Sequence, residues 1–340
     1  MSIVFEEVKE AAEFDIGKFS LAAPFTQSFE YGEWQREVGR NVRRWVGKEG
    51  GAIIGAVQLI EYPLAKNKTY WYAPYGPVWK EKPDEHYLEA LKTKLEELVQ
   101  ETASVFVRIE LPSSLQPKGL KTAPSVTTRG SFLQPRAEWV LDIKESEERL
   151  LREMHHNTRY SIRAAERRGV RTEVIEGQKL PEHFEEFYAL LEETAKRDAF
   201  TLHAKEYYEG VFRVSAENNS AFLVLAKHEM NILAAHFIVC CGRQANFVFG
   251  GSSSSHRELM GSYAAQWTAI RKAKTLGITR YNFGGVTAEI DAREQWGGLS
   301  SFKRKFGGTL LEHGHFRDLI GNKFWYYSYV ARKFLGTLGI

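Results

Sequence analysis

The feature that most constrains the fold of this chain is a pattern of elements that occurs twice. Each copy has two apolar segments joined by a short turn, then an aromatic segment, a glycine-containing loop, an amphipathic helix and a last apolar segment. Such an order forms a mixed α/β sheet unit. The copies cover residues 43–79, 86–103 and 105–110, and residues 222–256, 262–277 and 278–285.

The repeat predicts an α/β protein with two similar domains, each a mixed, twisted β-sheet flanked by helices. Residues 51–60, GAIIGAVQLI, align with residues 231–240, NILAAHFIVC. A chain of 340 residues is long enough for two domains. We place the first domain at residues 1–145 and the second at residues 146–340, including the C-terminal tail. Apolar residues make up 43% of the chain, which argues against disorder.

This order of elements resembles acyltransferases of the N-acetyltransferase type. In those enzymes the loop before the central helix usually reads Arg/Gln-x-x-Gly-x-Gly/Ala, and its N–H groups hold the pyrophosphate of coenzyme A. The loops here, YGPVWKEKPDEH at 75–86 and GGSSSSHRELMGSY at 250–263, do not match. Tyr263 stands where a small residue is needed. The mismatch argues against coenzyme A as the donor.

The cysteine content favours a cytoplasmic protein, whereas the net charge of +3 is only mildly basic and does not by itself indicate a nucleic-acid partner. Cys240 and Cys241 are adjacent in an apolar strand, where neighbouring side chains point to opposite faces. We therefore expect reduced core thiols. The first residues lack a basic region followed by an apolar run, so we expect no signal peptide. No apolar run reaches the length of about 18 residues that spans a bilayer.

Residues 146–169 are predicted to form one helix with a cationic face. Ser146 is the expected N-cap, and Gly169 is the expected stop. Between residues 149 and 171 there are seven arginines, no lysine and two glutamates. The cations at three- or four-residue spacing are Arg152, His155, Arg159, Arg163 and Arg167.

Two interpretations of this arginine face stay open. It is either a solvated helix surface or a surface for an anionic partner such as an RNA backbone. Only two acids are available nearby for pairing along the helix. Arginine without lysine favours planar, bidentate contacts to phosphate.

Five segments together resemble one known family. They lie in order along the chain, and each alone is weakly specific. The segments are QSFEYGEWQREVG at 27–39, MHHNTRYSIRAAERRGV at 154–170, TAKRDAFTLHAKEYYEGVF at 194–212, RYNFGGV at 280–286 and FKRKFGG at 302–308. They are similar to motifs of the FemABX peptidyltransferases.

The resemblance implies a fold and a reaction. The family has two acyltransferase-type domains, in agreement with the repeat. Its members transfer an amino acid from aminoacyl-tRNA to the stem peptide of a peptidoglycan precursor, which is nucleotide-linked or lipid-linked. The chain shows no helical coiled-coil insertion and would be a short form. No metal or other cofactor is expected, because the ester donor is already activated.

The resemblance also implies site residues. Phe302 and Lys303 match the family's Phe-Lys pair near the aminoacyl end of the tRNA. Arg304, Lys305, Arg159 and Arg163 are candidates for contacts to the tRNA backbone. The candidates for precursor binding are Arg36, Tyr72, Arg197, His203 and Tyr207. Three positions depart from the family pattern, namely Tyr75 and His203 in place of arginine and Asn282 in place of aspartate.

The expected chemistry is aminolysis of an ester. An amine attacks the ester carbonyl, and the tetrahedral oxyanion must be stabilised by several kcal/mol. Lys303 is expected either to stabilise this oxyanion as a point charge or to bind the terminal tRNA phosphates. Asp198, Glu206 and His203 lie in one segment, but no spacing marks one of them as the base.

Two other hypotheses remain at this point. One is an N-acyltransferase of the same fold that uses acyl-coenzyme A or an acyl carrier, and the other is a non-catalytic RNA-binding protein. The tail at 322–340 joins aromatic side chains to Lys323, Arg332 and Lys333. It is expected either to cap the second domain or to contact the inner face of the membrane peripherally.

Overall fold

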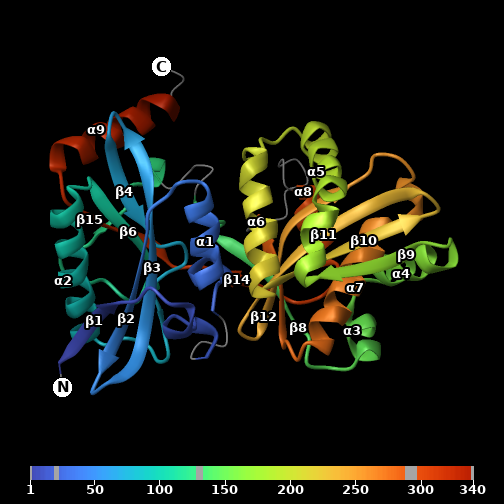
Figure 1. Cartoon of the computed structure of the whole chain (residues 1–340), viewed down its shortest axis with the longest axis horizontal. Helices are drawn as coiled ribbons and strands as arrows, with labels where there is room; N and C mark the ends of the chain where they lie inside the picture. Colours follow the sequence, from blue (N-terminus) through green and yellow to red (C-terminus); the bar gives the residue numbers. More distant parts are fainter. Residues whose placement is uncertain (1, 19–22, 128–132, 288–296, 338–340) are drawn as a thin grey trace. The chain divides into compact units, whose positions relative to one another are not determined.

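The chain divides into two compact units. The computed structural model describes all residues except 1, 19–22, 128–132, 288–296 and 338–340. Unit 1 contains Met1–Arg136 and His313–Ile340, and unit 2 contains Ala137–Glu312. Each unit has its own mixed sheet with helices on both faces (Figure 1).

Unit 1 is built on a sheet with the strand order β1-β2-β3-β4-β6-β15-β7, and β5 pairs with β3. The strands are β1 (Ile3–Glu7), β2 (Val42–Glu49), β3 (Ala52–Ala65), β4 (Lys68–Tyr72), β5 (Val78–Trp79), β6 (Phe106–Leu111), β7 (Lys121–Thr122) and β15 (His315–Ile320). The helices are α1 (Phe29–Glu37), α2 (Glu85–Thr102) and α9 (Lys323–Thr337), with short 3-10 turns η1 (Ala11–Glu13), η2 (Ile16–Lys18), η3 (Phe25–Gln27) and η4 (Ser125–Thr127).

Unit 2 is built on a sheet with the strand order β14-β8-β13-β12-β11-β10-β9. The strands are β8 (Ala137–Asp142), β9 (Arg171–Glu176), β10 (Ala221–His228), β11 (Asn231–Cys241), β12 (Gln244–Ser252), β13 (Arg280–Gly285) and β14 (Thr309–Glu312). The helices are α3 (Glu147–Glu153), α4 (His156–Arg167), α5 (Phe184–Asp198), α6 (Lys205–Asn218), α7 (Gly261–Thr275) and α8 (Gly297–Arg304), with η5 (Gly177–His183) and η6 (Arg257–Leu259).

The two sheets repeat the same pairing. In unit 1, β2, β3 and β4 are antiparallel neighbours, and β4 then pairs in parallel with β6 through Trp71↔Val107 and Tyr72↔Arg108. In unit 2, β10, β11 and β12 are antiparallel neighbours, and β12 pairs in parallel with β13. The long crossovers contain α2 and α7, as a parallel pair requires. The predicted repeat is confirmed.

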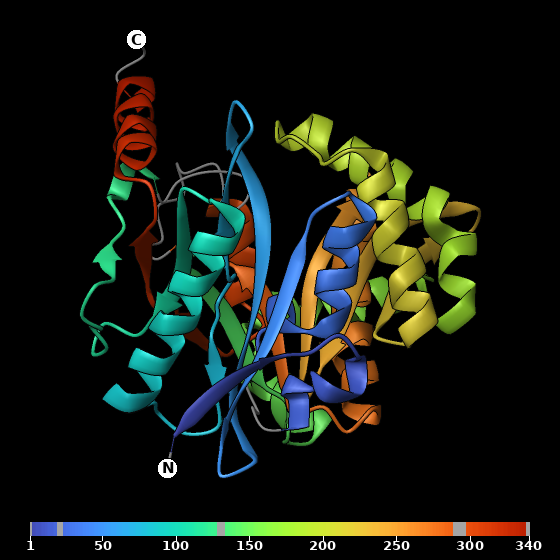
Figure 2. The ribbon, with the colours of Figure 1, turned by 60° about the vertical axis from the view of Figure 1, so that its left-hand side comes forward.

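The core of unit 1 follows from the alternation of side chains along its strands. Leucines at three- and four-residue spacing on α2 pack against Trp45, Val57 and Trp71, and Figure 2 shows α2 lying along the sheet. Burying each leucine contributes about 1.5–3 kcal/mol. The leucines are Leu88, Leu91, Leu95 and Leu98.

The opposite face of this sheet holds α1 through a buried arginine. Arg44 donates to Glu33 Oε1 of α1 at 2.6 Å and to Gln58 Oε1 of β3 at 2.7 Å. A Cβ atom at Gly32 would lie 2.2 Å from the Arg44 guanidinium, so only glycine allows this close approach. Ser28 caps α1 by accepting from the Tyr31 N–H.

The core of unit 2 has two layers of helices. On one face of the sheet α7 packs against β10 and β11, and α4 packs against α7. On the other face α5 and α6 cover β11 and β12, with Phe187 and Phe212 against Phe237 of β11. Among the residues that the structure describes, no helix is both long and apolar enough to cross a bilayer.

The predicted domain boundaries differ from this division. β8, which was placed in the first domain, pairs with β13 and β14 in the sheet of unit 2. β15, which was placed in the second domain, pairs with β6 in the sheet of unit 1. The tail also packs on unit 1, because α9 contacts η4. The sheet to which each strand belongs is decided by hydrogen bonds to strands that are distant in the sequence, and the order of the sequence does not reveal these bonds.

The prediction of one helix at 146–169 is wrong. Ser146 caps α3 as expected, but α3 ends at Glu153 and α4 begins at His156. Met154 has extended backbone angles and is buried, and His155 Nδ1 accepts from the Asn157 N–H at 3.2 Å as a new cap. The burial of Met154 and this cap favour an interruption of the helix between α3 and α4, which the spacing of the charged residues does not indicate.

The C-terminal strand is held in unit 1 by a buried ion pair. Arg108 on β6 is 1% exposed and Asp318 on β15 is 0% exposed. The guanidinium makes two hydrogen bonds of 2.7 Å to the two carboxylate oxygens, and it also donates to Thr127. Tyr326 of α9 donates to the same carboxylate at 2.8 Å. One charged pair therefore connects β6, β15 and α9.

We expect Asp318→Asn to destabilise the protein by about 3–5 kcal/mol, because it leaves the buried Arg108 charge without a charge of opposite sign. Urea unfolding would measure this. Asp142→Asn is the matched control, since Asp142 lies on β8 and makes an exposed pair with Lys144. Its cost should be about 0.5 kcal/mol or less. Equal costs for both variants would contradict the role of the buried pair.

Candidate active site

The candidate active site lies where the parallel strands of unit 2 separate. β12 and β13 pair only through Gln244↔Arg280, Ala245↔Tyr281 and Asn246↔Asn282. Asn282 fixes the end of β13, since its Nδ2 donates to Glu138 Oε2 at 2.9 Å and its Oδ1 accepts from the Gly284 N–H at 2.8 Å. Beyond this point the two strands are no longer paired.

Lys303 of α8 reaches this point. Its side chain is 5% exposed, and Nζ donates to the Gly285 carbonyl at 2.7 Å. Gly284, with φ +75, lies beside the amine, since Nζ is 3.8 Å from where a Cβ atom of this residue would be. Burial lowers the pKa of Lys303 to about 8, although Glu138 acts in the opposite direction. The amine is thus mostly protonated at pH 7.

Phe302 positions α8 from the adjacent residue. Its ring packs edge-on against Tyr263 of α7, with centroids 5.0 Å apart, and against Phe306 at 5.2 Å. Phe306 is fully buried and also contacts Phe283 of β13. This aromatic cluster fixes the orientation of the helix that carries Lys303.

The other two cations of this segment have different surroundings. Arg304 stacks over Trp139 of β8 at 4.6 Å and donates to the Thr287 carbonyl at 2.6 Å. The Lys305 carbonyl accepts from the His155 N–H at 2.9 Å, at the break between α3 and α4. Sequence alone could not show that α8 and α4 are neighbours.

A small cleft lies along this break. It has a volume of about 350 Å³ and brings Arg152, Arg159 and Arg163 around the apolar Leu151, with Glu148 at its side. Arg159 donates to the Arg152 carbonyl at 3.0 Å and to the Met154 carbonyl, which holds it at the end of α3. Partial desolvation together with His156, Lys305 and Arg159 lowers the pKa of His155. The hydrogen bond from the His155 N–H to the Lys305 carbonyl joins this cleft to the segment that follows α8.

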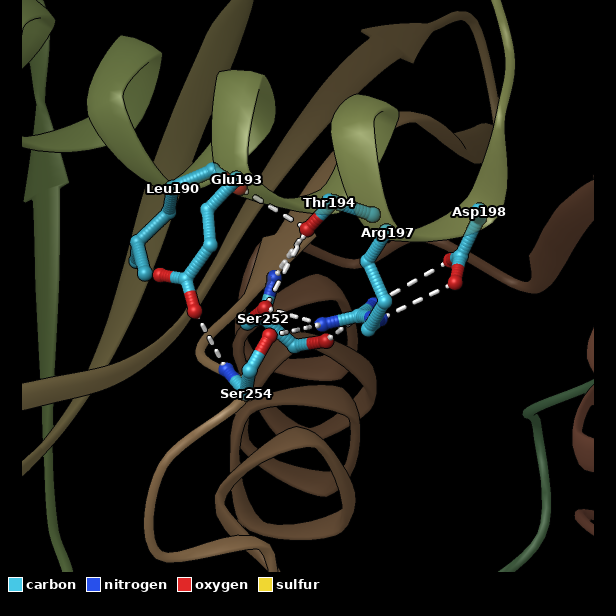
Figure 3. A network of polar contacts seen from close by, with 7 residues as sticks. All are labelled: Leu190, Glu193, Thr194, Arg197, Asp198, Ser252 and Ser254. Carbon is cyan, nitrogen blue, oxygen red and sulfur yellow. Dashed lines mark hydrogen bonds and ion pairs between the residues drawn. The ribbon is translucent and has the colours of Figure 1, made fainter.

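Arg197 lies on the other face of the sheet and holds the end of β12 (Figure 3). It donates to the Ser252 carbonyl at 2.7 Å and to both carboxylate oxygens of Asp198. Thr194 Oγ1 accepts from the Ser252 N–H at 2.8 Å, and Glu193 Oε1 accepts from the Ser254 N–H at 2.6 Å. The geometry gives Arg197 a positioning role for the loop after β12.

His203 and Tyr207 come together beside β12. Their rings lie 4.5 Å apart, with His203 exposed and Tyr207 buried. Tyr207 also contacts Phe249 of β12 edge-on at 6.5 Å. Both residues therefore lie on the α6 side of the same strand whose end separates from β13.

The two predicted residues of unit 1 have different surroundings. Arg36 is exposed and pairs with Glu33 at 3.1 Å. It borders a cleft of about 660 Å³ whose lining includes Arg40, Arg43 and Trp71.

Tyr72, in contrast, is fully buried, and its hydroxyl donates to Glu110. The structure thus gives Tyr72 the role of holding a carboxyl group.

Sequence reasoning missed Glu110. This side chain on β6 is buried, accepts from the Tyr75 N–H at 2.9 Å and has a pKa raised by burial. The last residues paired in parallel are Arg108 on β6 and Asn282 on β13. Glu110 and Gly284 each lie two residues further along, so they occupy corresponding positions in the two units. The signal was present in VFVRIE, where charged residues alternate with apolar ones in a strand.

His236 of β11 was also missed. It is buried against Phe247, with ring centroids 4.7 Å apart, and burial lowers its pKa to about 3. In the part of the chain that the structure describes, its Nδ1 has no hydrogen-bond partner. It is therefore a neutral imidazole beside the strand that separates from β13.

Comparisons with known proteins agree on the fold. The chain is 21% identical over 362 residues to the lipid II:glycine glycyltransferase of Staphylococcus epidermidis, covering 84% of this chain and 85% of that protein. A crystal structure of FemX superposes with a TM-score of 0.83 at 19% identity, covering 95% of this chain and 99% of that one.

A tandem GNAT protein from the clavulanic acid biosynthesis pathway gives a TM-score of 0.51 at 12% identity, covering 94% of this chain and 99% of that one. The predicted fold class, with two mixed sheets of the N-acetyltransferase type, is thus confirmed. A sequence profile of the FemAB family matches residues 115–232 and 226–332. The chain belongs to the FemAB family.

Proposed function

We propose that this protein is an aminoacyltransferase that transfers an amino acid from aminoacyl-tRNA to the stem peptide of a peptidoglycan precursor. The observation that carries the proposal is the buried Lys303 amine at the separated ends of β12 and β13, next to the cationic surface of α4. The similarity to a lipid II:glycine glycyltransferase over most of both chains supports the class of acceptor.

The reaction forms one bond and breaks one. The acceptor amine attacks the ester carbonyl, the C–N bond forms, and the C–O bond to the tRNA ribose breaks. The amine loses its proton, and the ribose oxygen leaves as a hydroxyl. Lys303 stabilises the oxyanion of the tetrahedral intermediate, because a cation in a water-excluded site acts much more strongly than in water.

The geometry of Lys303 suits this role. One of its three N–H groups donates to the Gly285 carbonyl. The other two N–H groups have no acceptor among the residues that the structure describes. The Gly285 contact and the aromatic packing of Phe302 fix the amine before the donor arrives. A fixed donor costs no reorganisation during the reaction, which is the basis of preorganised catalysis.

The arginine surface is proposed to bind the donor. Arg159 and Arg163 border the cleft at the α3–α4 break, and Lys305 lies beside it. Arg304 is proposed to join them, although its guanidinium already stacks on Trp139. These side chains suit contacts to phosphates and carry no sequence information, in keeping with a donor recognised through its backbone.

Each unit is proposed to offer its own residues for binding the acceptor. Arg36 borders the larger cleft of unit 1 and suits a precursor phosphate. Tyr72 acts through Glu110, and Arg197 acts through the end of β12. His203 and Tyr207 offer a polar and aromatic surface beside that strand.

The deciding assay supplies charged tRNA together with a nucleotide-linked or lipid-linked precursor and measures mass added to the stem peptide. Acyl-coenzyme A in place of charged tRNA tests the alternative donor. Transfer from acyl-coenzyme A, and from no charged tRNA, would replace this proposal with an ordinary N-acyltransferase.

We expect Lys303→Met to lower kcat about 100-fold or more, since it removes one preorganised donor to the oxyanion. Steady-state kinetics with charged tRNA would measure this. Lys305→Met is the matched control and should act mainly on KM for the tRNA. If Lys303→Met changed only that KM, the oxyanion role would be wrong.

The pH profile separates a cationic from a basic role for Lys303. With a pKa near 8, the amine loses its charge as pH rises through that value. If the charge stabilises the oxyanion, kcat falls above about pH 8. A kcat that instead rises through pH 8 and then levels off would assign Lys303 as a base. The descending limb should be absent in any residual activity of Lys303→Met.

We expect Arg159→Gln/Arg163→Gln to weaken tRNA binding and to lower its salt dependence. The slope of log K against log salt should fall by about 1–2, one unit for each lost phosphate contact. Filter binding with uncharged tRNA at several salt concentrations would measure it. Arg213→Gln on α6 is a control, because Arg213 is an exposed cation on the opposite face of the sheet. An unchanged slope would remove α4 from the donor site.

A further inference from the structure

The C-terminal helix α9 presents an apolar stripe to the solvent. Phe324 is 73% exposed, and Tyr327, Phe334 and Leu335 are about half exposed. Successive members of this set are three, seven and one residues apart, and these intervals place all four side chains on one side of a helix. A large apolar side chain exposed alone is ordinary, but a row of four on one helix indicates a binding surface.

The inner side of α9 holds the helix on unit 1. Tyr326 is buried and donates to Asp318, and Tyr329 stacks on Phe106 of β6. Arg332 donates to the Leu64 carbonyl at the end of β3, at 3.2 Å. Figures 1 and 2 show α9 in red, next to the label that marks the C-terminus. The outward stripe is therefore carried by a fixed helix.

The charged side chains on α9 all have the same sign. Lys323 and Arg332 are exposed and lie on either side of the stripe by helical spacing, and Lys333 is partly buried. Lys121 of β7 donates to the Tyr327 hydroxyl at 3.3 Å. From 319 to 340 the sequence contains no aspartate or glutamate.

We propose that the stripe of α9 docks unit 1 on the surface of an anionic phospholipid bilayer. Aromatic and aliphatic side chains enter the interfacial region while flanking cations meet the lipid phosphates. Two copies of this helix placed face to face would oppose like charges, so a second copy is the poorer occupant. The surface acts in the plane of the membrane and does not span it.

Membrane docking does not depend on the proposed function, but its benefit to the enzyme does rest on that function. A lipid-linked acceptor is confined to the membrane, so an enzyme held there meets it at a higher local concentration. Lipid binding itself requires neither tRNA nor precursor and is tested without them.

The experiment is flotation of the full chain with vesicles of phosphatidylcholine, with and without about 30 mol% phosphatidylglycerol. We expect binding only to the anionic vesicles, and weaker binding as salt is raised. Phe324→Ser/Phe334→Ser should lower the partition coefficient about tenfold or more, because both rings leave the bilayer. Lys323→Gln/Arg332→Gln should lower it similarly, by about fivefold for each charge.

Met230→Ser/Leu276→Ser is the matched control. Met230 is 96% exposed and Leu276 is about half exposed, and both lie in unit 2. This control should bind vesicles as the wild type does. Thermal unfolding should give this control and Phe324→Ser/Phe334→Ser the Tm of the wild type, since their substituted side chains are exposed. The Tm of Lys323→Gln/Arg332→Gln is measured separately, because this variant also removes the hydrogen bond from Arg332 to the Leu64 carbonyl. Equal binding by the Phe324→Ser/Phe334→Ser variant and the wild type would overturn the proposal, as would no preference for anionic lipid.

Two further readouts separate the alternatives. Light scattering after gel filtration tests self-association, and a dimer that only the phenylalanine variant disrupts would assign the stripe to a second copy and overturn lipid docking. Transfer to a soluble, nucleotide-linked acceptor should be unchanged in that variant. If the wild type transfers nothing but still binds vesicles, the proposed reaction fails while the docking surface stands.

Discussion

The ion pair between Arg108 and Asp318 is the interaction on which unit 1 depends. The two residues are 210 positions apart and both are buried. Removing two charges from water is costly, and further hydrogen bonds to Thr127 and from Tyr326 help to offset the loss. The pair joins the C-terminal strand to the sheet and, through Tyr326, sets the face that α9 turns to the solvent. The proposed membrane surface is thus a consequence of how the sheet of unit 1 is completed.

The two units share one strand plan but put different groups at the end of the parallel pair. In unit 2, Gly284 lies beside the Lys303 amine, which enters from α8. In unit 1 the corresponding strand position is Glu110, whose carboxyl is held by Tyr72 and the Tyr75 N–H. Burial moves the pKa of each group towards its neutral form, downward for the lysine and upward for the glutamate. Among the described residues, unit 2 thus places an amine next to this strand position, whereas unit 1 places a carboxyl group there.

The cationic surface shows how a local pattern acquires meaning from its neighbours. Arginines at helical spacing are compatible with a solvated face. The break at Met154 shortens the helix and turns Arg159 towards the carbonyls that end α3. The contact of His155 with Lys305 then places this surface beside the segment that carries Lys303. A donor bound along α4 would meet the buried amine within the same unit, which neither segment indicates alone.

The sequence by itself determined the repeat, the fold class, the family resemblance and the cap at Ser146, because alternation, helical spacing and capping are local properties of the chain. The tertiary structure alone decided that β15 completes the first sheet, that Lys303 is buried, that Glu110 is held by Tyr72 and that α9 exposes Phe324. Each of these depends on contacts between residues far apart in the sequence. The cost of burying a charge is set by those contacts, and so the same lysine or glutamate is a solvated charge in one fold and a reactive group in another.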